Sequence, residues 1–130
     1  MINSGVFNYV NVLDKAADAS WLRNEAIANN LANADTPGYK RQDVSFEAEL
    51  GKALKYNHYE SMDSKVAHLT TDSIEPRVFK DYSGFSYRLD GNNVDPDTEG
   101  VMLAKNQIKY QGLLESITNE FNNIKIAIKK

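Results

Sequence analysis

The sequence predicts a mainly α-helical protein in which long N- and C-terminal helices form a coiled-coil-like pair, joined by a short middle region of loops and a small β-hairpin. Two heptad-like seams, one at each end of the chain, are the first two observations behind this prediction. The third is the middle, where helical periodicity fades and aromatic residues are interrupted by glycine. We expect one domain over 1–130, with helices at 5–34 and 95–130 and the loops, a short helix and the hairpin at 35–94.

Composition narrows the functional classes. With 130 residues, 42% hydrophobic and 25% charged, the chain has the values of an ordinary single domain. A formal net charge of -3 argues against nucleic acid as a partner. The chain has no cysteine, which excludes disulfides and thiolate sites. Its start lacks a positive region and an unbroken apolar region, so no cleaved secretory signal is expected, and no stretch approaches the roughly 18 apolar residues of a spanning helix.

The N-terminal helix is predicted by residues that recur in alternating steps of four and three, the spacing of a coiled-coil seam. These residues are Val6, Val10, Leu13, Ala17, Ser20, Asn24, Ile27, Leu31 and Ala34. Polar groups at seam positions, here Ser20 and Asn24, commonly fix helix register at some cost in stability. Pro37 biases Thr36 away from helical angles, and Pro37 and Gly38 together suit the centre of a type II turn, so the helix should end there.

The middle region gives weaker signals. SFEAELGKALKY is predicted to form a short helix that uses Phe46, Leu50 and Leu54. The residues from 57 to 76 have little periodicity and many polar side chains, and we assign them no regular structure. VFKDY and FSYRL favour strands and predict a hairpin with its turn at 90–93.

The C-terminal helix has a clear start. Asp95 can cap it, Pro96 suits the first helical position, and two acidic residues in the first turn complement the helix dipole. The seam residues are Leu103, Gln107, Tyr110, Leu114, Ile117, Phe121, Ile124 and Ile128. Gly100 and Gly112 each cost about 1 kcal/mol relative to alanine in a helix, so we expect a neighbouring backbone to approach closely there.

A catalytic site has little support. His58 and His68 lie in the polar middle with Ser61, Asp63 and Ser64 nearby, and a hydrolase could be imagined from these residue types. A general base needs a fixed geometry and an orienting partner, and nothing in the sequence supplies them. Solvated loop residues are the better interpretation, and no enzyme activity is predicted.

Two other binding patterns are also weak. Asp95, Asp97 and Glu99 resemble the opening of a calcium loop, but Asn106 stands where the closing glutamate belongs, so a capped helix start is favoured. IKIAIKK continues the seam and is too short for a membrane-surface helix. The sequence has no glycine-rich phosphate loop. We expect no cofactor, no metal and no small-molecule substrate.

The residues ANNLANADTPGYKR, 28–41, place three asparagines at the end of the first helix. Asparagine is a poor helix former, so Asn29, Asn30 and Asn33 carry a local cost that outside contacts should offset. Their amides can bond to exposed carbonyls or to a neighbouring chain. Small residues beside them, such as Ala28 and Ala32, leave room for close packing. The helix end is therefore suited to being surrounded.

This stretch resembles the N-terminal signature of the bacterial flagellar rod, hook and hook-associated proteins. RLDGNNVDPDTEGVMLAKNQIKYQ, 88–111, resembles the segment that opens the C-terminal helix in proximal rod members of the flagellar basal-body rod protein family. Fewer than about sixty residues separate the two motifs, so the large β-rich domains of hook and distal rod members do not fit. The family motif residues are Ala28, Asn29, Asn30, Leu31, Ala32, Asn33, Thr36, Pro37, Gly38 and Tyr39, followed by Asp90, Gly91, Asn92, Asn93 and Asp95.

The resemblance implies a structural subunit of the proximal rod that self-assembles through its terminal helices. It implies contacts with copies of itself, with other rod proteins and with an adaptor at the rod base on the MS ring. It also implies export through the flagellar type III apparatus into the periplasm-spanning rod. The asparagines would then make lateral contacts and caps, with bonds formed only in the assembly. The alternative is a soluble helical adaptor or chaperone that binds a partner helix, because the periodicity of the two seams, taken alone, favours a self-sufficient hairpin over an assembly surface.

Overall fold

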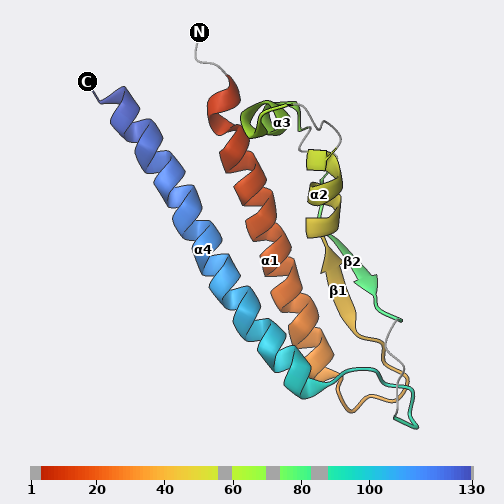
Figure 1. Cartoon of the computed structure of the whole chain (residues 1–130). Coiled ribbons are helices and arrows are strands. Elements are labelled where there is room, and N and C mark those ends of the chain that lie inside the picture. Colours follow the sequence, from red (N-terminus) through yellow and green to blue (C-terminus); the bar gives the residue numbers. More distant parts are fainter. Residues whose placement is uncertain (1–3, 56–59, 70–73, 83–87, 130) are drawn as a thin grey trace.

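A computed structural model describes residues 4–55, 60–69, 74–82 and 88–129. Two long helices, α1 (Asn8–Ala32) and α4 (Pro96–Ile128), lie side by side and antiparallel (Figure 1). A 3₁₀ turn, Ser4–Phe7, precedes α1. The middle elements cover the other side of α1: β1 (Gln42–Ser45), α2 (Glu47–Lys55), α3 (Met62–His68) and β2 (Arg77–Lys80). The predicted fold class is confirmed.

The hydrophobic core lies between α1 and the layer formed by the sheet and α2. Its buried members are Ala19, Ala26, Val44, Phe46 and Ile74. Alanines on α1 let the strand and Phe46 approach the helix closely, while Leu50 of α2 packs against the edge of the cluster. The short helix predicted from Phe46, Leu50 and Leu54 is therefore confirmed. The core occupies the face of α1 opposite to much of α4.

The predicted seam of α1 faces inward. Val10, Ala17, Ser20, Ile27 and Ala34 are buried, and Leu13, Asn24 and Leu31 are half-buried. Only the first member, Val6, is exposed. The four-and-three periodicity thus identified the buried side of this helix.

The packing face of α4 differs from the predicted seam. The row Leu103, Tyr110, Ile117 and Ile124 is half-buried as expected, but Gln107, Leu114, Phe121 and Ile128 are exposed. The second row against α1 is instead Glu99, Asn106, Leu113 and Glu120. Polar contacts cause this difference: the amide of Asn106 donates to the backbone oxygen of Ser20 at 2.7 Å and to Asn24 Oδ1 at 2.8 Å. These bonds set the rotation of α4 and turn apolar residues outward.

The glycines of α4 also differ from expectation. A Cβ atom at Gly100 or Gly112 would meet nothing within 4 Å, so no backbone among the described residues approaches them closely. Their cost to the helix is not offset by packing among the described residues.

The small sheet is antiparallel, but it is not the predicted hairpin. β2 falls in the predicted strand VFKDY, yet its partner is β1, with Gln42 opposite Lys80 and Ser45 opposite Arg77. FSYRL lies largely in 83–87, outside the described residues. β1 was missed because it is short and carries only one core residue, Val44.

The helix α3 corrects another expectation, because it lies in the segment to which no structure was assigned. Ser61 caps it by accepting a hydrogen bond from the backbone N–H of Ser64 at 3.3 Å. One buried residue, Val66, anchors it. Such a helix has no periodic apolar pattern, and only its cap marks it in the sequence. No helix in the described ranges is long and apolar enough to cross a membrane.

Candidate functional site

The first family motif ends α1 with a tight turn. Asn33 is the C-terminal cap residue, and its backbone N–H donates to the carbonyls of Asn29 and Asn30 at 3.1 and 3.2 Å. The backbone N–H of Tyr39 then donates to the carbonyl of Thr36 at 3.3 Å. Gly38 has φ +72°, which the third position of a type II turn requires. The predicted turn is confirmed.

The second motif packs directly on this turn. Asn92 is fully buried, and its side-chain nitrogen lies 2.9 Å from the carbonyl oxygens of Asn33, Ala34 and Thr36. It therefore caps the free carbonyls at the end of α1 from a distant part of the chain. The backbone N–H of Gly38 also donates to the carbonyl of Asp90 at 2.7 Å.

Three further residues of the second motif, Gly91, Asn93 and Asp95, have separate roles. Gly91 has φ +75°, and a Cβ there would lie 3.9 Å from the Cα of Gly38, so the two turns meet closely. Asn93 accepts from the backbone N–H of Arg41 at 2.7 Å. Asp95 caps α4 by accepting from the backbone N–H of Asp97 at 3.1 Å, as the sequence predicts. The two motifs, more than fifty residues apart in sequence, form one structural unit.

Asn30 corrects the expectation that the asparagines would find partners only in an assembly. Its side chain is 0% exposed, and its nitrogen donates to the carbonyl of Gln42 at 2.8 Å and to Glu99 at 3.1 Å. Its oxygen accepts from the backbone N–H of Gln42 at 2.7 Å and from the Tyr39 hydroxyl at 3.2 Å. The hydrogen bonds that offset the poor helix propensity of Asn30 are therefore made within its own chain.

The other motif residues on α1 are closer to the surface. Asn33 donates from its side chain to the carbonyl of Asn29 at 2.8 Å. Ala28, Asn29 and Ala32 are exposed, and Leu31 is half-buried. The exposed residues remain available to a neighbour, whereas Asn30 and Asn92 serve the fold.

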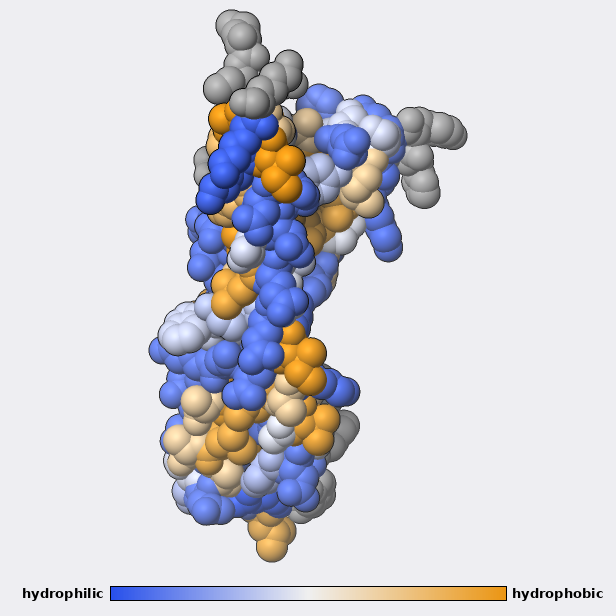
Figure 2. Space-filling view, turned by 90° about the vertical axis from the view of Figure 1, so that its left-hand side faces the viewer, coloured by the Kyte–Doolittle hydropathy of each residue, from blue (hydrophilic) through white to orange (hydrophobic). Residues whose placement is uncertain are grey.

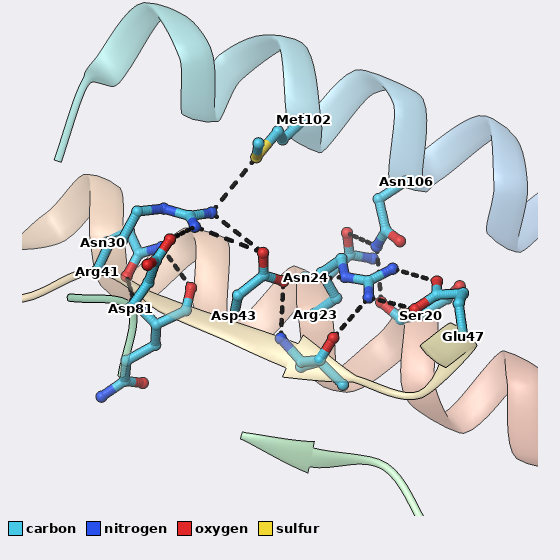
Figure 3. Close-up of polar contacts among 12 residues, drawn as sticks. Ser20, Arg23, Asn24, Asn30, Arg41, Asp43, Glu47, Asp81, Met102 and Asn106 are labelled. Atoms are coloured by element: carbon cyan, nitrogen blue, oxygen red, sulfur yellow. Dashed lines mark hydrogen bonds and ion pairs between the residues drawn. The ribbon is translucent and has the colours of Figure 1, made fainter. Parts of the chain in front are cut away.

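Arg41 is the centre of an ion-pair cluster that the sequence did not predict. Its guanidinium donates to Glu99 at 2.8 Å. It also donates to Asp81 at 2.7 Å and lies 3.4 Å from Asp43 (Figure 3). Partial burial works against the charged form, but the hydrogen bonds to Glu99 and Asp81 prevail and raise the pKa of Arg41 above its usual range. Glu99 was considered as a helix-dipole residue, and nothing in its spacing from Arg41 indicated this contact.

A second ionic cluster joins α1, α2 and α4. Arg23 donates to both carboxylate oxygens of Glu47, at 2.6 and 2.7 Å, and Lys109 of α4 contacts the same carboxylate. Arg23 also donates to the carbonyl of Val44 at 2.7 Å. The hydrogen bonds from Arg23 hold the pKa of Glu47 well below its usual range despite partial burial.

A pocket of about 260 Å³ opens between α1, α4 and the β1 side of the molecule. We call it the seam pocket, and its lining residues are Arg23, Ile27, Arg41, Asp43, Met102, Lys105, Asn106 and Lys109. Figure 3 shows Met102 and Asn106 on α4 facing Arg41, Asp43 and Arg23 on the opposite wall. The side-chain oxygen of Asn106 is buried and has no hydrogen-bond partner in the described parts of the chain, and the same holds for the hydroxyl of Ser20.

The imagined hydrolase site does not form among the described residues. His68 lies on the surface of α3, where Ser64 Oγ and Glu60 Oε2 approach the same ring nitrogen, Nδ1, at 3.5 and 3.7 Å. A catalytic triad needs the nucleophile and the carboxylate on different nitrogens of the ring. His58 lies outside the described residues.

The outer surface of α4 carries a row of apolar side chains at intervals of seven residues. We call this row, Leu114, Phe121 and Ile128, the α4 stripe; its members are 43%, 49% and 77% exposed. Figure 2, which looks onto the α4 side of the molecule, shows apolar patches between polar residues. A row of apolar side chains along one helix is a surface that a neighbouring helix can cover.

Comparison with known proteins gives the family. Residues 16–40 match the family described as flagella basal body rod protein. The chain is 35% identical to the flagellar basal body rod protein FlgB of Bacillus subtilis (strain 168), with 89% of each chain covered. It is 33% identical to the FlgB protein of Buchnera aphidicola subsp. Acyrthosiphon pisum, over 95% of this chain and 99% of the relative. For Escherichia coli (strain K12) FlgB the identity is 31%, over 78% and 79%.

The matched residues 16–40 contain the end of α1 and its turn, which the second motif caps. The relatives cover most of both chains, so the likeness extends beyond that motif to the helix pair. The family is structural, not a class of enzymes. On this evidence the chain belongs to the flagellar basal body rod protein family, as a structural rod subunit related to the proximal rod proteins named FlgB.

Proposed function

We propose that this subunit joins the proximal rod by packing the α4 stripe against helices of neighbouring subunits. The stripe carries the proposal, because its members recur every seven residues beside the contact with α1 and remain 43%, 49% and 77% exposed. In the free chain these side chains contact water. In the rod, a neighbouring helix would cover them.

The energetic gain from covering the stripe is substantial. Fully burying a leucine, isoleucine or phenylalanine contributes about 1.5–3 kcal/mol. Because the three side chains are already partly covered, each subunit would gain roughly 3 kcal/mol from the stripe alone. That sum is one favourable contribution to assembly, which must also offset the translational and rotational freedom lost on association.

The partners follow from the family and from the shape of the surface. A helix that already pairs with α1 and carries a second apolar row can link its own pair to the next one, and so build an open series. We propose that the neighbours are copies of this chain, other rod proteins and an adaptor at the rod base on the MS ring. We further propose that the chain reaches the periplasm-spanning rod through the flagellar type III export apparatus.

The test replaces stripe residues by glutamate. Each variant is produced in the bacterium that makes this protein, after its own copy has been deleted. Leu114→Glu and Phe121→Glu should abolish swimming, because a charge would be buried at each contact. Asn122→Glu is the matched control, since Asn122 is exposed and polar on the same turn of α4.

Two further measurements separate assembly from folding and export. Circular dichroism of each purified variant should match the unsubstituted chain, because the replaced side chains are exposed. The amount of each variant released by the cells should also stay unchanged. Swimming at the unsubstituted rate by both stripe variants would reject the proposal.

A further inference from the structure

The surface of α1 carries an uncovered aromatic side chain in a fixed position. Trp21, the one tryptophan of the sequence, is 64% exposed. Its ring lies against that of Tyr110 on α4, with centroids 6.2 Å apart and planes tilted by 47°. This contact holds the indole beside the helix pair without burying it. Tryptophan in such a position is typical of the residues that dominate protein interfaces.

Acidic residues flank Trp21 along the same face of α1. Asp18 lies one turn before it, Glu25 one turn after it and Asp14 two turns before it, and all are exposed. We call this row of three carboxylates with Trp21 the acidic edge. None of the three carboxylates pairs with another residue in the described parts of the chain. The acidic edge therefore fits a basic surface with room for one aromatic ring.

The seam pocket lies on the opposite edge of the helix pair, and four of its eight lining residues are cationic while one, Asp43, is acidic. Arg23, in its wall, follows Trp21 by two residues, which places it about 200° around α1. The pocket also lies at the height of Trp21, because its wall residue Asn106 hydrogen bonds to Ser20 and Asn24, on either side of Trp21. A copy placed beside another in the same orientation would bring the two surfaces together.

The lining of the seam pocket suits an indole. Ile27 and Met102 provide apolar and thioether contacts, and the guanidinium groups of Arg23 and Arg41 can face an aromatic ring. The pocket volume of about 260 Å³ is below the roughly 300–1,000 Å³ of small-molecule sites, but it can hold one side chain.

Charges agree with the same arrangement. Lys105 at the pocket is exposed and pairs with no other residue that the structure describes. Because α1 and α4 are antiparallel, Glu25, which follows Trp21 on α1, lies nearer than Trp21 to the N-terminal end of α4. If two copies stand side by side in one orientation, Glu25 of one copy is at the level of Lys105 of the other. Asp18 lies in the other direction, at the level of Lys109.

We propose that Trp21 of one subunit inserts into the seam pocket of a second copy of this chain, with Glu25 paired to Lys105 across the contact. The two surfaces differ, so the contact is heterologous and can repeat in one direction around the rod. The inference rests on the proposed function and adds the side-by-side contact that the α4 stripe does not define.

The test uses cysteine pairs, which the cysteine-free sequence makes unambiguous. Two differently tagged copies, one with Glu25→Cys and one with Lys105→Cys, are produced together in the bacterium lacking its own copy. Mild oxidation of intact cells should join the two tagged copies by a disulfide bond. The control pair, Glu25→Cys with Glu115→Cys, should give at least tenfold less product, because Glu115 lies ten residues, about 15 Å, further along α4.

A charge exchange tests the same contact without cysteine. Glu25→Lys or Lys105→Glu alone should reduce the swimming rate about tenfold or more, through like charges at each contact. The two changes in one chain should restore swimming, because every contact regains an opposite pair. A merely structural effect of either substitution would persist in the double variant.

The outcomes separate this inference from the proposed function. Swimming cells whose isolated basal bodies contain both tags but no linked product would overturn the Trp21 contact and leave the rod function intact. Linkage of either tag to a different rod protein would overturn the choice of a second copy. Absence of the unsubstituted chain from basal bodies would overturn both.

Discussion

Asn30→Ala provides a quantitative test of the buried amide that joins the two family motifs. The substitution removes four hydrogen bonds and leaves the N–H and carbonyl of Gln42 without their partner. Each orphaned group costs about 1–3 kcal/mol, so the loss is roughly 3–4 kcal/mol for the two backbone groups. The better helix propensity of alanine returns at most about 0.7 kcal/mol. The net destabilisation is about 3 kcal/mol.

Urea unfolding followed by circular dichroism measures this loss. For a chain of this size, about 3 kcal/mol corresponds to a fall in Tm of roughly 10 °C. Asn29→Ala is the matched control, because Asn29 is the neighbour of Asn30 and is exposed. This substitution should leave the free energy of unfolding unchanged or slightly higher. Equal midpoints for the two variants would refute the argument that Asn30 supports the fold from within.

Two further substitutions test the helix and the ionic cluster. Gly112→Ala should raise the free energy of unfolding by up to about 1 kcal/mol, since its Cβ meets nothing within 4 Å; an unchanged or lower urea midpoint would contradict this. The pKa of Glu47 is lowered in the folded state by hydrogen bonds from Arg23, so the unfolded chain takes up the proton first as the pH falls. Its contribution is complete above about pH 5 and is lost as the pH falls through about 4 toward the lower folded value. Glu47→Gln should therefore flatten stability against pH below about 5, and an unchanged slope in urea unfolding would exclude this role.

The long helices could be predicted from the sequence because each repeats one physical signal many times. Along α1, apolar and small residues in steps of four and three meet the same buried side, from Val10 to Ala34. At the start of α4, Asp95 and Pro96 act locally, so their roles follow from neighbouring residues alone. The turn at Pro37 and Gly38 is local in the same way.

The rest depends on contacts between distant residues. The rotation of α4 follows from Asn106 bonding to Ser20 across 86 residues, which periodicity cannot encode. Arg41 hydrogen bonds to Glu99, 58 residues away in the sequence. β1 pairs with β2, and Val44 of β1 packs in the core. The motif residue Asn30 drew attention for the right reason, its helix cost, but its partners lie in its own chain.

Segment-resolved amide hydrogen exchange, on the free subunit and on isolated rods, reports which parts of α1 and α4 are stable before assembly and which become stable in it. The free chain forms a helix pair fixed at the capped turns, and we expect its exposed apolar row to be covered only in the assembly. In the free subunit, 15–33 and 96–110 should be protected while 114–128 exchanges faster, and in rods 114–128 should become protected. Equal protection of 114–128 in both states would contradict the claim that the α4 stripe is an assembly surface.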